Sequence, residues 1–146
     1  MIRLRLPNVK LDHDTCYQYC GDAASLPSTY TMDDTHIREM LAVVDERDWT
    51  SLRRYFHDAV VYLRPGYAPL QGVDAVMHFY EFERVIASGT HVVNVVLVDG
   101  THVASFGRLI GTHRNGSALD EEFAEHYEFR EGKVWRRKSY FFRAAI

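Results

Sequence analysis

The chain is poor in the features that define several large classes of protein. Only two of its 146 residues are cysteines, Cys16 and Cys20, which is too few for a disulfide framework. No run of about eighteen consecutive apolar residues occurs, so the sequence predicts no membrane-spanning helix. The opening residues, MIRLRLP, contain no apolar stretch of the kind that signal peptides carry, and we therefore expect a cytoplasmic protein.

A strong charge of either sign is also missing. Seventeen Lys and Arg residues oppose twenty Asp and Glu residues, which gives a net charge of −3 and a pI near 6.2. Nucleic acids and anionic membranes attract basic proteins, so we expect neither as a partner. The chain has no Gly-rich phosphate loop and no Gly-x-Ser-x-Gly elbow. Hydrophobic residues, at 47%, and aromatic residues, at 13%, suffice for the core of one globular domain and could line a pocket.

Apolar residues at helical spacing predict helices in the first half of the chain. Residues 1–31 show no sustained periodicity, so we interpret them as an N-terminal arm before a domain at residues 32–146. The spacing i, i+3, i+4, i+7 then appears in two stretches, with a shorter apolar cluster between them. These patterns predict a first helix that is capped by Asp33 or Asp34 and ends near Arg47. They predict a second helix from Trp49 to about His57 and a third from Gly72 to about Gly89.

The second half of the chain is typical of a sheet. Three dipeptides in which glycine follows Asp, Asn or Glu separate four long β-prone segments, and each dipeptide is a hairpin-turn signal. A short strand at residues 59–63 precedes them, followed by a loop at residues 67–71. Helices first and strands afterwards indicate an α+β fold, with the helices packed on a curved, mainly antiparallel sheet. The four long strands are predicted at residues 91–98, 103–112, 119–129 and 134–142.

Several motifs, in this order and at these spacings, resemble a known superfamily. They are VDERDW at residues 44–49, DAVVY at 58–62, GVDAVMHFY at 72–80, FAEHYEFREGKV at 123–134, and RKSYF at 137–141. Together they are similar to the nuclear transport factor 2-like superfamily, and within it to the SnoaL-like polyketide cyclases and the ketosteroid isomerases.

The resemblance covers about residues 33–143 and implies a fold and a mode of action. The fold is a cone-shaped α+β barrel, in which helices wrap a curved sheet around a pocket. Many members are homodimers through the outer face of the sheet, so we expect a homodimer. The implied activity is cofactor-independent chemistry on a small hydrophobic, oxygenated metabolite in natural-product biosynthesis. Cyclisation, isomerisation and epoxide opening all remain open, because function is decided by the site and not by the fold.

Glu125 is the leading candidate for chemistry. On its predicted strand it shares one face with Phe123, Tyr127 and Phe129, and an aromatic environment raises the pKa of a carboxyl group. The resemblance implies a catalytic carboxylate here, either the proton-abstracting base of the cyclases or the acid that hydrogen-bonds an oxyanion in the isomerases. The alternative is a structural salt bridge with Arg137, which would lower the pKa and weaken a role as an acid.

Two positions depart from the ketosteroid isomerases. Arg64 stands where those enzymes carry a general-base Asp, and Met40 stands where they carry an oxyanion-hole Tyr. Arginine is not a base near neutral pH, and methionine has no hydrogen to donate. We therefore expect no isomerase of the usual mechanism. Arg64 could bind a carboxylate, enolate or phosphate, or it could be an ordinary surface residue at a strand end.

Aromatic residues complete the predicted pocket. A phenol combines an apolar ring with one polar handle, so Tyr62 and Tyr80 are the candidate catalytic donors to a carbonyl or epoxide oxygen. Packing in a plain core is the alternative for each ring. The remaining candidates, expected to contact a flat hydrophobic substrate, are Tyr55, Phe79, Tyr127 and Phe141, together with Arg64 and Arg137.

The spacing of the eight histidines gives no indication of a metal site. A metal needs ligands that converge with fixed geometry, and the spacing of these histidines shows no close His-x-His pair. We therefore expect neither a metal nor a cofactor. The competing functional hypothesis is a non-catalytic ligand-binding or dimeric assembly domain of the same fold, because the groups at Met40 and Arg64 that the isomerases use are replaced.

Overall fold

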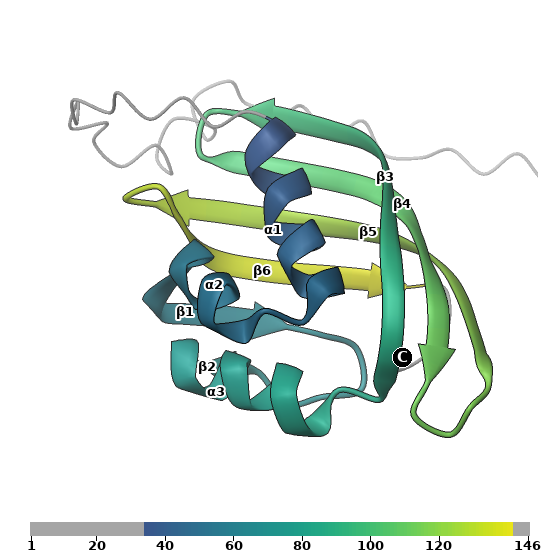
Figure 1. Cartoon of the computed structure of the whole chain (residues 1–146). Coiled ribbons are helices and arrows are strands. Elements are labelled where there is room, and N and C mark those ends of the chain that lie inside the picture. The colour runs from purple at the N-terminus through teal and green to yellow at the C-terminus, as the bar shows by residue number, and fades with distance from the viewer. Residues whose placement is uncertain (1–33, 142–146) are drawn as a thin grey trace, which may run out of the picture.

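Helices cover one face of a strongly curved sheet in the computed structural model, which describes residues 34–141 (Figure 1). The predicted N-terminal arm at residues 1–31 lies outside the described residues. Three α-helices and six strands make up the described part, so the predicted α+β class is confirmed. The sheet is curved but does not close into a barrel. None of the described helices is long and apolar enough to cross a membrane.

The first helix, α1 (Asp34–Glu46), buries the apolar stripe that predicted it. It ends where Arg47 adopts a φ of 60°, in the left-handed region that cannot continue a helix. The Asp48 side chain then caps α2 (Trp49–Leu52) by accepting a hydrogen bond from the backbone N–H of Ser51 at 3.0 Å. A 3₁₀ turn, η1 (Arg53–Tyr55), follows, and the first strand already begins at Phe56. The predicted second helix was therefore too long at its C-terminal end.

The third helix also ends earlier than predicted. Helix α3 (Val73–His78) passes into a π-helical turn, η2 (Phe79–Glu83), which is closed by a hydrogen bond of 2.8 Å from the Arg84 N–H to the Phe79 carbonyl. Gly89 is therefore no helix stop. It lies within a strand, where a Cβ atom would approach the Leu109 side chain to 3.0 Å. The glycine therefore allows close packing between strands, and its interpretation as a helix cap was wrong.

The sheet has the strand order β2-β1-β6-β5-β4-β3. Neighbouring strands are antiparallel except β1 and β6, which run parallel. The predicted loop at residues 67–71 contains a short edge strand that pairs with β1, which corrects that prediction. The bounds are β1 (Phe56–Leu63), β2 (Leu70–Gln71), β3 (Ile86–Asp99), β4 (His102–His113), β5 (Ala118–Arg130) and β6 (Lys133–Phe141).

The inner faces of β5 and β6 determine where the candidate site lies. Along β5 the inward side chains are those the alternation predicted, and Phe123, Glu125, Tyr127 and Phe129 are all at most 6% exposed. The register sets Tyr127 beside Arg137 and Glu125 beside Ser139. On the other side of β6, parallel pairing sets Tyr62 of β1 beside Arg137. Polar groups from three strands thus meet beneath the helices.

Candidate functional site

A buried carboxylate–guanidinium pair lies at the centre of this polar cluster. The Arg137 guanidinium donates to Glu125 from Nε at 3.0 Å, and from one terminal nitrogen to both carboxylate oxygens, at 2.6 and 2.7 Å. Ser139 donates to the Glu125 Oε1 atom at 2.7 Å, and the Tyr127 hydroxyl donates to Oε2. Glu125 is 5% exposed and Arg137 3%, so the pair is hidden from water.

This pairing decides the protonation state of Glu125. Burial raises the pKa of the carboxyl group, but the charge and hydrogen bonds of Arg137, with those of Tyr127 and Ser139, outweigh burial and lower it below its usual value. Glu125 is therefore a carboxylate near neutral pH. The expectation of a raised pKa is wrong, because it took account of the aromatic face of β5 but not of the partner from β6. The alternative, an ion pair with Arg137, is what the structure contains.

The opposite side of Arg137 holds Tyr80. The second terminal nitrogen of the guanidinium donates to the Tyr80 hydroxyl at 2.5 Å, and Tyr80 itself stacks on Trp49, with ring centroids 5.5 Å apart. Burial raises the pKa of Tyr80 to about 12, against the opposing charge of Arg137. Tyr80 is thus a neutral phenol at physiological pH. Its oxygen accepts from Arg137, so its own hydrogen is left to donate elsewhere.

Tyr62 differs from the other two buried phenols. Its oxygen lies 3.0 Å from Ser139 Oγ and accepts a hydrogen bond from an Arg64 terminal nitrogen at 3.0 Å. Ser139 has one hydrogen and donates it to Glu125, so Tyr62 must be the donor to Ser139. A continuous donor chain therefore runs from Tyr62 through Ser139 to the carboxylate.

The charges around Tyr62 favour its ionised form. Burial raises the pKa of the phenol, but the positive charges of Arg137 and Arg64 outweigh it, and the net effect is a pKa below the usual value. The Arg137 guanidinium lies over the Tyr62 ring, 4.7 Å from its centroid. In Tyr127 burial is reinforced by the charge of Glu125, so its pKa is well above the usual value. Of these neighbouring phenols, Tyr62 is the one whose pKa is lowered.

Arg64 lies at the edge of the cluster and is not a surface residue. It is 7% exposed, and its guanidinium lies over the rings of Phe79 at 5.3 Å and Phe141 at 5.1 Å. A hollow of about 260 Å³ opens beside it. The hollow is lined by Arg64 and Ser139, the two polar partners of Tyr62, and by Leu63, Pro65, Tyr67, Lys138 and Tyr140. Cation, hydroxyl and aromatic rings therefore meet at one opening.

Most of the predicted site residues come together, with one exception. Tyr55 packs edge-to-face against His36 at 5.2 Å and makes no hydrogen bond to the cluster described above. Two residues that the sequence analysis missed do belong to the cluster: Ser139 and Arg84. Ser139 could have been found by alternation, because it lies between Arg137 and Phe141 on the inner face of β6. Arg84 follows an irregular turn, where no periodicity applies.

A second, larger hollow of about 490 Å³ lies over strands β3 to β6. Its lining is mostly aromatic and apolar, and it includes Phe106, Phe123, Tyr140 and Phe141 but neither Tyr62 nor Glu125. Size alone would favour it as a binding site. Tyr62 and Glu125 do not line the smaller hollow either, but Arg64 and Ser139, which both contact the Tyr62 oxygen, do line it. We therefore place the candidate site at the smaller hollow.

Comparison with known families fits this fold. The model of the SnoaL-like domain matches residues 37–137 of the chain. The chain belongs to the SnoaL-like family. A search of curated proteins finds no match to it.

Solved structures similar to this SnoaL-like chain share its fold. A nuclear transport factor 2-like protein of unknown function from Burkholderia pseudomallei is 18% identical, with a TM-score of 0.66 over 73% of this chain and 88% of that one. An LEH-like epoxide hydrolase from M. tuberculosis is 13% identical, with a TM-score of 0.65 over 73% and 80%. TerC, co-crystallised with polyporic acid, is 20% identical, with a TM-score of 0.65 over 73% and 88%. These identities establish the fold and leave the reaction open.

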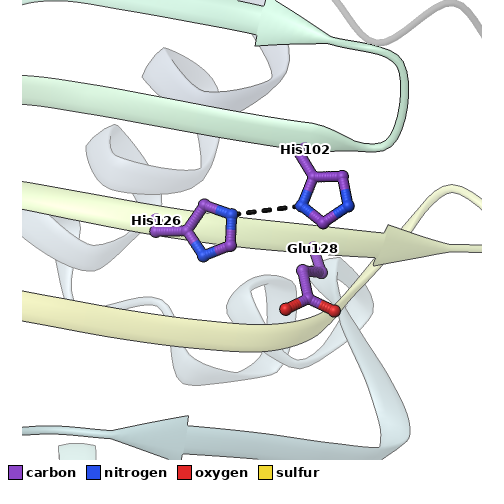
Figure 2. Close-up of side chains that lie close together, drawn as sticks. All are labelled: His102, His126 and Glu128. Carbon is purple, nitrogen blue, oxygen red and sulfur yellow. Dashed lines mark hydrogen bonds between the residues drawn. The ribbon is translucent and has the colours of Figure 1, made fainter. Parts of the chain in front are cut away.

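Three side chains on the outer face of the SnoaL-like sheet could hold a metal, which the sequence analysis did not predict. Figure 2 shows His102 of β4 beside His126 and Glu128 of β5, and the ligand atoms of all three lie within 4.8 Å of one another. The two imidazoles lie at an interplanar angle of 11° and share a hydrogen bond, 3.2 Å between their nitrogens. That bond engages the facing nitrogen of each ring, one through its hydrogen and the other through its lone pair, and Arg136 lies 4.0 Å from the Glu128 carboxylate. We assign no metal to this cluster.

The lowered pKa of Glu125 predicts a dependence of stability on pH. A carboxylate whose pKa is lower in the folded than in the unfolded protein stabilises the fold above the unfolded value, taken as 4.5, and this contribution is lost as pH falls through the folded value. We expect the free energy of unfolding of the wild type to decrease once the pH is lowered below about 4.5. The Glu125→Gln variant should be less stable at pH 7 and lack this contribution to the slope. Urea unfolding between pH 3 and 7 measures both, and equal slopes in the two proteins would refute the assignment.

Proposed function

We propose that this SnoaL-like chain is a cofactor-independent enzyme in which Tyr62 exchanges a proton with a hydrophobic, oxygenated small molecule. The observation that carries the proposal is the position of the Tyr62 oxygen between Ser139 and Arg64, both of which line the hollow of about 260 Å³. A proton-transfer group works best when its pKa lies near the working pH, and the two arginines shift the phenol in that direction.

The other residues have distinct roles in this proposal. Glu125 stays ionised and acts as a positioning residue, because it fixes Arg137 and, through Ser139, the hydroxyl of Tyr62. Arg64 stabilises negative charge that develops on a substrate oxygen, and Tyr80 donates its free hydrogen to that oxygen. Phe79 and Tyr127, which are fully buried, and Phe141, which is partly buried, pack as aromatic rings around the polar cluster.

Such an arrangement suits reactions in which a proton is taken from carbon beside a carbonyl group and later returned. Tyr62 as phenolate accepts the proton, the electron pair of the broken C–H bond becomes the enolate, and the oxygen of the enolate faces the arginine. The proton then returns to another carbon atom. In the alternative course the enolate attacks a second carbonyl group, a C–C bond forms, and Tyr62 gives its proton to the alkoxide oxygen that results. Double-bond shift and aldol-type ring closure both follow this course, and a phenol donor also suits epoxide opening. A place in natural-product biosynthesis agrees with these chemistries.

The test is a turnover screen with flat, oxygenated hydrophobic compounds, repeated with Tyr62→Phe. Loss of turnover with retained binding would support proton transfer by Tyr62. Undiminished turnover by the variant would refute it.

A non-catalytic binding or assembly domain is the second candidate. This candidate is favoured by the hydrogen bonds of Glu125. Within the described part of the chain, both of its carboxylate oxygens already accept from Arg137, Tyr127 or Ser139, so neither is left for a ligand. In that case removal of the Tyr62 hydroxyl would change binding and melting temperature, but no chemical turnover would exist to be lost.

The outer face of the sheet supports a homodimer in either case. Large apolar side chains lie exposed there, with Phe106 at 42% and Leu97 at 57%. We propose that a second copy of this chain covers them, since aromatic and aliphatic patches of this kind are typical of interfaces. Sedimentation velocity at micromolar concentration should show a dimer for the wild type and a monomer for Phe106→Glu. A wild-type monomer at that concentration would contradict the proposal.

A further inference from the structure

Arg84 is a buried cation that the mechanism above does not use. It follows the π-helical turn η2, and its side chain turns inward, so that the residue is only 6% exposed. Its buried Nε atom has no hydrogen-bond partner, and no ion pair among residues 34–141 includes this guanidinium. The Arg84 guanidinium lies over the ring of Tyr80, 5.5 Å from its centroid.

An unpaired guanidinium in this position is costly for the protein. Burying a charge without a partner carries a large desolvation penalty, and buried polar groups in folded proteins are nearly always satisfied. The contact with Tyr80 compensates part of this cost, because a cation over an aromatic ring is attracted to it. It provides no hydrogen-bond acceptor for the five N–H groups of the guanidinium.

The charges nearby make the deficit larger. The carboxylate of Glu125 is fully occupied by Arg137, Tyr127 and Ser139, so it is not available to Arg84. Arg64 and Arg137 both carry positive charge close enough to oppose the charge of Arg84. After burial, which is the largest cause, they contribute to lowering the pKa of Arg84. The central carboxylate therefore gives Arg84 neither a hydrogen bond nor an ion pair.

We propose that Arg84 binds the acid group of an organic acid, a carboxylate or an acidic enol, whose aromatic or alicyclic body packs near Tyr80. The planar guanidinium presents paired N–H groups that match the two oxygens of a carboxylate. This inference rests on the proposed small-molecule site and narrows its ligand class from oxygenated to anionic. The acid group would supply the hydrogen-bond acceptor that the described residues do not give to the Nε atom of Arg84.

The test compares acids with their neutral amides. Benzoate and 2-naphthoate, benzamide and 2-naphthamide, and inorganic phosphate are titrated into the wild type, Arg84→Met and Arg108→Met, with melting temperature and calorimetric Kd as readouts. Arg108 is the matched control, because its guanidinium pairs with Asp120 on the surface. We expect at least one acid to bind the wild type and Arg108→Met more tightly than its amide does. Its Kd should weaken about tenfold or more in Arg84→Met, the usual worth of a hydrogen bond to a charged group.

The ligand-free proteins give a second, independent readout. If Arg84 serves to bind an anion, replacing it by Met removes an uncompensated charge. The Arg84→Met variant should then melt at the same temperature as the wild type or higher. If Arg84 instead serves the fold through Tyr80, the variant melts lower or fails to fold, which overturns the proposal. Three binding results would also overturn the proposal. They are equal Kd values for an acid in the wild type and in Arg84→Met, an equal rise in melting temperature with inorganic phosphate and with the acids, and no binding of either acid to the wild type.

The same measurements distinguish a failure of the anion site from a failure of the proposed proton transfer by Tyr62. Tyr62→Phe leaves Arg84 in place, so acid binding that survives in this variant while turnover is lost supports both proposals. Loss of the preference for acids with Tyr62-dependent turnover intact would overturn the anion site alone.

Discussion

Replacing Arg137 by Met should lower the free energy of unfolding at pH 7 by about 3–5 kcal/mol, the usual cost of removing one member of a buried ion pair. The physical reason is the carboxylate left behind. Glu125 is 5% exposed and would lose its main counter-charge, while Tyr127 and Ser139 alone cannot replace it. Urea unfolding measures the loss, and it should shrink at low pH as Glu125 takes up a proton.

The chain offers a matched control for this prediction. Arg108 and Asp120 form a similar two-pronged pair, with a terminal nitrogen 2.7 Å from the carboxylate, but both side chains are about half exposed. Arg108→Met should therefore change stability little, because water solvates the remaining charge. The double variant Glu125→Met/Arg137→Met should recover much of the loss, since an apolar pair needs no counter-charge. Equal effects of Arg137→Met and Arg108→Met would contradict the buried-pair account.

Removing the hydroxyl of Tyr62 should reduce turnover by about 10²- to 10⁴-fold, the usual contribution of a positioned proton donor or acceptor. The substrate is whichever compound of the panel the wild type converts. Binding should change far less than turnover, because the ring and the cations around it remain. The comparison requires kcat and KM for both proteins and a melting curve for each.

Tyr127→Phe is the control for this second prediction. It also removes one buried hydroxyl of the same cluster, and its hydrogen bond goes to the same carboxylate. Its raised pKa keeps that phenol neutral, so we expect an effect on stability and a much smaller effect on kcat. If both variants lose turnover equally, the hydroxyl of Tyr62 has no special role and the loss reflects general disturbance of the cluster.

Local patterns predicted well what depends on one strand or one helix. Alternation along β5 placed Glu125 and Tyr127 on the inner face, and helical spacing identified the buried stripe of α1, because both patterns repeat within a single element. The same reasoning extended to β6 would have found Ser139. The possibility of a Glu125–Arg137 pair was also visible, since hairpin strands are neighbours.

Pairings between distant segments could not be predicted in this way. Tyr62 meets Arg137 because β1 runs parallel to β6, a register that no turn signal specifies. The shift of the Tyr62 pKa depends on that meeting, and so the sequence analysis could not distinguish Tyr62 from the other candidate phenols. Arg84 was missed for a related reason: the π-helical turn that aims it inward has no recognisable sequence period.

The most direct measurement of the central claim is a spectrophotometric titration of the tyrosines in the wild type and in Tyr62→Phe. Phenolate absorbs at longer ultraviolet wavelengths than phenol, so each ionisation can be followed with no substrate. We predict that the wild type shows a phenol ionising below 10, the ordinary value, and that this transition is missing from the variant. Identical titration curves below pH 10 would show that the arginines do not prepare Tyr62 for proton transfer, and the proposed function would lose its basis.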